Sequence, residues 1–285
     1  MTTHHLTLQA LHPLTQQQAL VQQIATLTQA RHITPLHEHA LRLDNVRLTK
    51  ELTTQINHDC YAAQIDVACL PSHLHLADFQ LVAMDMDSTL ITIECIDEIA
   101  DMQGLKPEVA AITEAAMRGE IEFQESLTRR VALLKGLDAR ALQKVYDQRL
   151  ALSLGAEAML NGVQAAGLKT LLVSGGFTFF TERMQARCKL DFSHANTLEI
   201  QDDKLTGKVL GGIVDADEKR RTVERVCAEL GINTAQAIVM GDGANDLKMM
   251  DIAGLSVAFR AKPVVRAQAD VALNFVGLDG VLTLL

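Results

Sequence analysis

The 285-residue sequence contains no tryptophan, and aromatic residues make up only 4% of it. Its core must therefore consist of aliphatic residues and methionine. No apolar stretch approaches the ~18 residues of a membrane span, and the first Lys or Arg is Arg31, so we expect no basic signal-peptide leader. The five cysteines are scattered and form no Cys-x-x-Cys pair, which favours a reducing compartment over a disulfide framework. Together these absences predict a cytoplasmic protein without a membrane partner.

Positive charge is also scarce. The chain has 26 Lys and Arg against 35 Asp and Glu, a formal net charge of −9. This balance argues against nucleic acid as the main partner, because a polyanion would be repelled. A phosphorylated small molecule would need local positive charge to bind. The length exceeds that of one ordinary domain and predicts two or three folding units.

Glycine is absent from the first 80 residues, and nine of the ten histidines lie there. Beyond this stretch the first glycine is Gly104 and the one remaining histidine is His194. Residues 1–78 combine short alternating apolar runs with a helical pattern in "TQQQALVQQIATLTQA". We predict a small N-terminal α+β domain of the ferredoxin-like type.

From residue 79 the pattern changes to buried apolar strands that alternate with helices: "LVAM", "LKTLLV", "AIVM", "LSVAF" and "DVALN". This alternation predicts an α/β core, a doubly wound and mostly parallel sheet covered on both faces. The stretch 95–150 is helical throughout and too long for a simple crossover between two strands. We therefore predict a core of residues 79–94 and 155–285, with residues 95–154 inserted as a helical cap.

Polar residues follow three of the predicted strands at the points where they end. In an open parallel sheet, the carboxyl ends of neighbouring strands share one edge, where ligands bind. We therefore expect these side chains to face one crevice, together with a lysine that begins a later helix. The set is Asp85 and Asp87, Ser174 and Gly175, Asp242, Asn245 and Asp246, and Lys219.

The four aspartates of this set need a counter-charge. Two like charges about 4 Å apart repel by about 4 kcal/mol at an effective dielectric near 20. A hard divalent cation with oxygen ligands resolves the repulsion, and Mg²⁺ typically binds one or two carboxylates together with substrate phosphate. The serine hydroxyl, the glycine amides and the lysine can then donate to phosphate oxygens.

The pair Asp85 and Asp87 supplies the groups that phosphoester hydrolysis requires. One carboxylate can act as a nucleophile and form an acyl phosphate. The second can protonate the leaving alkoxide and then activate water. Because side chains alternate along a strand, we expect the two to point the same way.

The motifs Asp85-x-Asp87-x-Thr89, Ser174-Gly, Lys219 and "GDGAND" (241–246) resemble, in order, those of the haloacid dehalogenase superfamily of phosphatases. The resemblance runs from about residue 80 to 280 and implies a Rossmann-like core. It implies that Asp85 is the nucleophile and Asp87 the general acid/base. Mg²⁺ would be held by Asp85, Asp242 and the backbone carbonyl of Asp87.

The same resemblance assigns the remaining core residues. Ser174, Gly175 and Lys219 would contact the phosphate, with Asn245 in a binding role. Asp246 would be a supporting group, through water or a hydrogen bond to the lysine. Some members of the superfamily carry ACT-like domains at the position of residues 1–78, although this stretch matches no such pattern clearly.

The predicted cap is similar to that of the phosphoserine phosphatase family. This resemblance implies that Glu94 receives the substrate ammonium and Arg130 its carboxylate, while Met117 and Phe123 form an apolar lid. Arginine is the better carboxylate clamp because its guanidinium binds in a bidentate manner. The expected activity is Mg²⁺-dependent hydrolysis of O-phospho-L-serine, the last step of L-serine biosynthesis.

Three alternatives stay open at this point. The core could transfer phosphate to an acceptor such as homoserine, or hydrolyse another small phosphomonoester. The chain could instead be a regulatory binding protein with an inert core, although an inert core has no reason to keep so many grouped acids. The sequence also leaves a homodimer open, and Arg130 or Glu94 taken singly could be surface charges.

Overall fold

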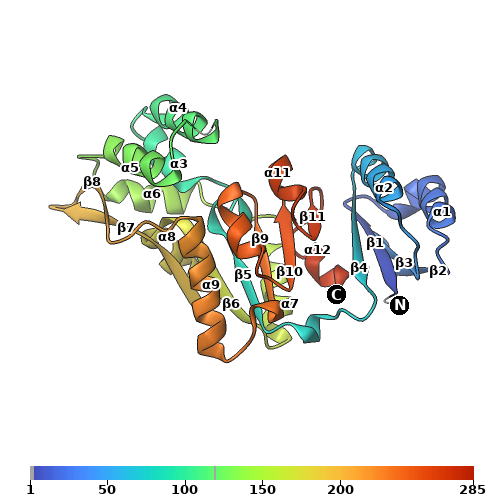
Figure 1. Ribbon diagram of the computed structural model, residues 1–285. Coiled ribbons are helices and arrows are strands. Elements are labelled where there is room, and N and C mark those ends of the chain that lie inside the picture. Colours follow the sequence, from blue (N-terminus) through green and yellow to red (C-terminus); the bar gives the residue numbers. More distant parts are fainter. Residues whose placement is uncertain (1–2, 119) are drawn as a thin grey trace.

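The computed structural model describes residues 3–118 and 120–285, without the side chain of Met117. Its N-terminal unit has the order βαββαβ, and its four strands form an antiparallel sheet in the order β2-β3-β1-β4 (Figure 1). This is the ferredoxin-like arrangement that the sequence predicts. The elements are β1 (His4–Ala10), α1 (Gln18–Leu27), β2 (His32–His37), β3 (Ala40–Asp44), α2 (Lys50–Ala62) and β4 (Ile65–Pro71).

Both faces of β1 are covered. Leu6, Leu8 and Ala10 pack in the cluster that includes α1 and α2. The alternate residues of the strand are buried as well, and Gln9 donates to the carbonyl of Gly280 in the core at 3.1 Å. The N-terminal sheet therefore lies between its own helices and the rest of the molecule, as Figure 1 shows.

The core is a seven-stranded sheet in the order β11-β10-β9-β5-β6-β7-β8. All neighbouring pairs are parallel except β7 and β8, which form an antiparallel hairpin. The strands are β5 (Leu81–Met84), β6 (Lys169–Phe177), β7 (Phe192–Gln201), β8 (Lys204–Leu210), β9 (Ala237–Gly241), β10 (Leu255–Phe259) and β11 (Val271–Leu273). The predicted mostly parallel sheet is confirmed.

Helices cover both faces of this sheet because the buried strands alternate their side chains. Val82 and Met84 pack with α7 (Ala156–Ala165), α8 (Thr178–Cys188) and α12 (Gly280–Leu284). Leu81 and Ala83 pack on the opposite side with α9 (Ala216–Leu230), α10 (Leu247–Met250) and α11 (Pro263–Arg266). The doubly wound architecture predicted from the sequence is therefore present.

Four helices lie over one end of the sheet, beside the β7–β8 hairpin (Figure 1): α3 (Cys95–Asp101), α4 (Lys106–Met117), α5 (Phe123–Leu133) and α6 (Arg140–Gln148). They fall within the range 95–154 predicted for the cap. The two connections to the core run side by side, since Ile91 and Leu152 form an antiparallel bridge. Gly136 and Leu137 exchange backbone hydrogen bonds with Leu205 of β8, each 2.8 Å long.

Among the described residues, no helix has the combination of length and apolar character that would let it span a bilayer.

Candidate active site

The site lies where three adjacent strands end. β5 is the central strand, with β6 and β9 on either side. Asp85 follows β5 directly, Ser174 and Gly175 lie in the last part of β6, and Asp242 follows β9. The structure thus brings together at one sheet edge the residues that the sequence places there.

A buried lysine joins two of the acids. Lys219, on α9, is fully buried, and its Nζ lies 2.8 Å from Asp85 Oδ1 and 2.7 Å from Asp246 Oδ1. Burial alone would lower the pKa of the ammonium, but the negative charges of Asp246 and Asp85 outweigh it and raise the pKa above its usual value. The lysine is therefore permanently charged and fixes the orientation of the Asp85 carboxylate.

Asp246 also organises the loop after β9. Its second oxygen accepts hydrogen bonds from the amides of Asp242 (3.1 Å) and Gly243 (3.0 Å). Gly241 leaves room for this arrangement, because a Cβ there would lie 2.5 Å from Asp246 Cγ. Asp246, predicted as a supporting group, therefore contacts both the lysine and this loop. Asn245 lies partly exposed in the short turn Ala244–Asp246 between them.

Asp87 reaches the site by a route that differs from the one we predicted. β5 ends at Met84, and residues 86–90 form a turn in which Ser88 has φ 56°. The alternation of side chains along a strand therefore does not explain the placement of Asp87. Its Oδ1 accepts from the Cys95 amide at 2.7 Å, and its Oδ2 accepts from Ser174 Oγ at 3.1 Å.

The glycines after Ser174 allow this approach. A Cβ on Gly176 would lie 2.6 Å from Asp87 Oδ2 and 3.0 Å from Ser174 Oγ. The Gly176 amide donates to Ser174 Oγ at 2.8 Å. A Cβ on Gly175 would lie 3.0 Å from the Phe123 ring, so this aromatic residue of the cap lies directly over the core.

The buried carboxyl groups of the site have raised pKa values. Burial, then repulsion from Asp246, raises the pKa of Asp85 well above its usual value. The same causes raise the pKa of Asp242 to about 6, and burial raises that of Asp87. Carboxylate oxygens of Asp85, Asp242 and Asp246 all lie within 4.8 Å of one another. A divalent cation would remove this repulsion, so the donor set fits a metal ion.

Asp246 is less available to a cation than its two neighbours. Both of its oxygens are already engaged, by Lys219 and by the two amides described above. Among the described residues, the Asp242 carboxylate accepts a single hydrogen bond, from the buried Thr89 hydroxyl at 3.4 Å. The free oxygens of the cluster therefore belong to Asp85 and Asp242, two of the residues predicted to hold the cation.

The cap region contributes one acidic and one basic side chain to the site, Glu94 and Arg130. Glu94 immediately precedes α3 and accepts from Ser88 Oγ at 2.6 Å. The residue is exposed on one side. Burial of its carboxylate is the main cause that raises its pKa to about 7, and repulsion from the charge of Asp87 is the second. Arg130, on α5, is half-buried, and its Nε donates to the Ser126 carbonyl at 3.4 Å. Met117 ends α4, and its side chain lies outside the described part of the structure.

Burial lowers the pKa of Arg130, while three carboxylates oppose this effect: Asp97 most strongly, then Glu94 and Asp87. Asp97 was not among the predicted site residues. Its Oδ1 is buried and has no hydrogen-bond partner among the described residues. The next acids of the same helix, Glu98 and Asp101, instead pair with Arg149 within the cap.

A second residue that the sequence did not indicate is Asn196 on β7, which is almost fully buried. Its side chain donates to the Gly175 carbonyl at 2.7 Å and accepts from the Val214 amide at 2.8 Å. It thereby joins the loop at the end of β6 to the segment that leads into α9 and Lys219. Its position within a hairpin strand gives no sequence signal for this role.

Comparison with known proteins agrees with this geometry. Residues 79–254 match the haloacid dehalogenase-like hydrolase family. A phosphoserine phosphatase from Polaromonas sp. (strain JS666) is 56% identical over 216 residues, which cover 74% of this chain and 92% of that protein. The chain belongs to the phosphoserine phosphatase family of haloacid dehalogenase-like hydrolases. It is thus a phosphoric monoester hydrolase acting on a small phosphoester, and its acidic cluster fits the metal site of such an enzyme.

Solved structures of phosphoserine phosphatases and related hydrolases have the same fold. A haloacid dehalogenase family hydrolase from Salmonella enterica serovar Typhi superposes with a TM-score of 0.88 at 34% identity, covering 99% of this chain and 98% of that one. A phosphoserine phosphatase with an analogue of its phospho-aspartyl intermediate gives a TM-score of 0.69 at 37% identity, covering 73% and 99%. The N-terminal unit is therefore shared with the first protein. The second protein aligns over nearly all of its own length, but this alignment covers only about three-quarters of the present chain.

Proposed function

We propose that this chain is a Mg²⁺-dependent phosphoserine phosphatase that hydrolyses O-phospho-L-serine to L-serine and phosphate through an aspartyl-phosphate on Asp85. The observation that carries the proposal is the placement of Asp85 and Asp87 beside the fully buried Lys219 at the carboxyl ends of the strands. The phosphoserine phosphatases to which the chain is 41–56% identical support the choice of substrate.

Asp85 and Asp242 would hold the cation, with the backbone carbonyl of Asp87 as a further donor. All of these ligands are oxygen atoms, which favours a hard cation such as Mg²⁺ over zinc or copper. When bound, the metal neutralises phosphate charge and lowers the repulsion between the acids.

In the first step, the Asp85 carboxylate attacks phosphorus. Its Oδ1 is held by Lys219 and by the Met86 amide, 2.7 Å away. The bond between phosphorus and the seryl oxygen breaks, and Asp87 gives its proton to that oxygen. Burial raises the pKa of Asp87, which makes the protonated form available for this transfer.

In the second step, the ionised Asp87 takes a proton from a water molecule that attacks the phosphorus of the aspartyl-phosphate. The acyl phosphate bond breaks and Asp85 is regenerated as a carboxylate. Throughout both steps Lys219 and Ser174 stabilise the negative charge of the phosphoryl oxygens. Phe123, which lies over Gly175, limits the access of bulk water.

The cap would recognise the amino-acid part of the substrate. Glu94 would receive the ammonium group and Arg130 the carboxylate. Arg130 suits this role because its guanidinium is half-buried and, among the described residues, no carboxylate lies within ion-pair distance of it.

The proposal is tested by phosphate release from phosphoserine, phosphothreonine and phosphotyrosine, each with Mg²⁺ and with EDTA. We expect release from phosphoserine, dependent on the metal, and none from Asp85→Asn. Activity in Asp85→Asn would exclude this residue as the nucleophile. Appearance of a phosphorylated acceptor when homoserine is added would favour phosphotransfer instead of hydrolysis.

The role of Arg130 has a matched control in its neighbour. Arg129 is exposed and pairs with Glu125 on the same helix. Arg130→Ala should raise KM for phosphoserine at least tenfold and leave KM for an aryl phosphate unchanged, whereas Arg129→Ala should change neither. Equal effects of Arg130→Ala on both substrates would remove it from substrate binding.

Three further expectations from the sequence stay predictions: the domain division at residues 78, 94 and 154, a homodimer, and a cytoplasmic location. An ACT-like character of the N-terminal unit is likewise a prediction, beyond the ferredoxin-like strand order described above.

A further inference from the structure

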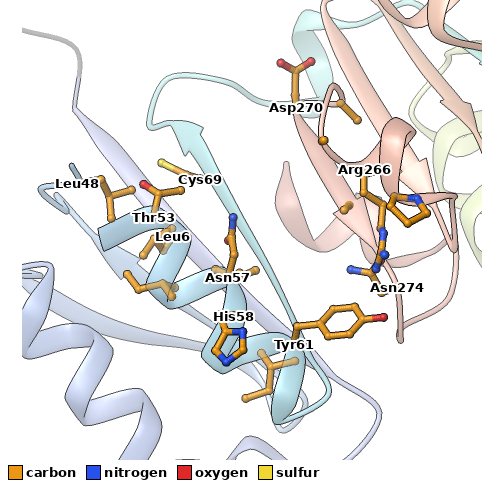
Figure 2. Close-up of a pocket in the computed structure, with 17 residues that line it drawn as sticks. Leu6, Leu48, Thr53, Asn57, His58, Tyr61, Cys69, Arg266, Asp270 and Asn274 are labelled. Carbon is orange, nitrogen blue, oxygen red and sulfur yellow. The ribbon is translucent and has the colours of Figure 1, made fainter. Parts of the chain in front are cut away.

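A cavity of about 520 Å³ lies between the N-terminal unit and the core, and none of the catalytic acids lines it (Figure 2). One wall comes from α2 and the neighbouring strands β1 and β4. The other comes from α11 and β11 of the core. Pockets of roughly 300–1,000 Å³ at domain boundaries are typical sites for small molecules.

The inner surface of the cavity is largely apolar. Leu48, Val67 and Cys69 contribute partly exposed side chains from the N-terminal unit, and Ala272 contributes from β11. The rim is polar, with Asn57 and Tyr61 on the same face of α2 because they are four residues apart. A ligand would therefore have an apolar body and a polar end.

One cation lines the cavity without an acidic partner. The guanidinium of Arg266 contacts the Asn274 amide oxygen at 3.4 Å and lies 5.2 Å from the centre of the Tyr61 ring. Neither group is charged, and among the described residues no carboxylate is within ion-pair distance of Arg266. Asp270, the acid that lines the cavity, is held by the amide (2.8 Å) and hydroxyl (2.6 Å) of Ser256.

Figure 2 shows the Tyr61 side chain reaching across to Arg266, while the Asp270 carboxylate points away from both. A single planar guanidinium binds a carboxylate in a bidentate manner. A phosphate dianion would need more positive charge than this cavity offers, with an acid also present in the wall. The charge balance therefore favours a monoanion.

Hydrogen bonds to a buried aspartate connect the two walls of the cavity. Asp66 of β4 is buried and accepts hydrogen bonds from the amides of Asn274, Phe275 and Val276 at 2.7, 2.9 and 2.9 Å. These bonds join the N-terminal unit to the segment that follows β11. The cavity is thus preformed, so a ligand need not open it.

We propose that this cavity is a binding site for a small amphipathic carboxylate. The carboxylate pairs with Arg266, and the apolar body of the ligand covers the partly exposed surface of Leu48, Val67 and Ala272.

The site is connected to the predicted metal loop. Arg266 lies one helical turn after Lys262, and its amide donates to the Lys262 carbonyl at 3.1 Å. The Lys262 amide in turn donates to the Asp242 carbonyl at 3.1 Å. A ligand that displaces Arg266 can therefore move Lys262, which directly precedes α11 and contacts the Asp242 loop.

The test uses the full-length protein and the fluorescent anion 8-anilino-1-naphthalenesulfonate, which combines one negative charge with apolar rings. We expect saturable fluorescence that octanoate displaces and that inorganic phosphate does not. Arg266→Gln should weaken binding at least fivefold. Ala267→Trp should do the same by filling the cavity mouth, since Ala267 is an exposed lining residue. Circular dichroism checks that both variants are folded.

Arg130→Ala is the control, because the arginine of the cap is the other place where an organic anion could bind. Unchanged binding in Arg266→Gln, or loss of binding in Arg130→Ala alone, would overturn the proposed site. The link to the metal loop is tested separately, by the Mg²⁺ concentration for half-maximal phosphate release with and without octanoate. No change in that concentration at saturating octanoate would exclude the link.

Discussion

Replacing Lys219 by methionine tests the electrostatic account of the site most directly. The substitution keeps the length of the side chain and removes one fully buried charge. It leaves Asp85 and Asp246 without the ammonium that lies 2.8 and 2.7 Å from them. Breaking a buried ion pair by removing one partner destabilises a protein by about 3–5 kcal/mol. For a domain of this size that is a loss of roughly 10 °C in Tm.

The effect should depend on pH with a definite sign. Without the ammonium, the folded cluster binds one proton more than it does in the unsubstituted protein, whereas the same carboxyl group in the unfolded chain is ionised above its ordinary pKa of about 4. The folded state then binds more protons, so its stability falls as pH rises, by about 1.4 kcal/mol per pH unit. Between pH 5.5 and 8 the destabilisation should therefore grow by about 3.5 kcal/mol.

The assay is urea unfolding of the metal-free protein at both pH values. Lys169→Met is the matched control, because Lys169 pairs with Asp191 at the same 2.7 Å distance but is 51% exposed. Exposed pairs contribute about 0–1 kcal/mol. If Lys219→Met is no less stable than Lys169→Met at pH 8, or if its loss is equal at both pH values, the reasoning is wrong.

Three other outcomes follow from the geometry. Asp97→Asn should raise KM for phosphoserine about tenfold without changing aryl phosphate hydrolysis, because Asp97 is the strongest favourable charge on Arg130; a matching loss with both substrates would contradict this. Gly176→Ala should lower kcat at least a hundredfold, since its Cβ would lie 2.6 Å from a catalytic carboxylate oxygen, whereas Gly212→Ala, with nothing within 4 Å, should be neutral in the same assay. Mg²⁺ at a hundred times its Kd should stabilise the protein by about 2.7 kcal/mol in thermal unfolding, and a similar gain in Asp242→Asn would rule out Asp242 as a ligand.

The sequence by itself determined the sheet, the side of the sheet that carries the site, and the residues that end its strands. It could do so because buried parallel strands have a local apolar signature and their carboxyl ends necessarily share one edge. These two properties are sufficient to place Asp85, Ser174 and Asp242 together.

Only the tertiary structure decided which groups contact one another across the sequence. The turn after β5 brings Asp87 to Ser174, and the fold buries Asn196 between two loops. Asp97 is distinguished from the other acids of its helix only by what surrounds it in space. The cavity between the two units likewise depends on the bonds of Asp66 to a segment more than 200 residues away. Such contacts have no local pattern in the sequence, because they are fixed by packing between distant segments.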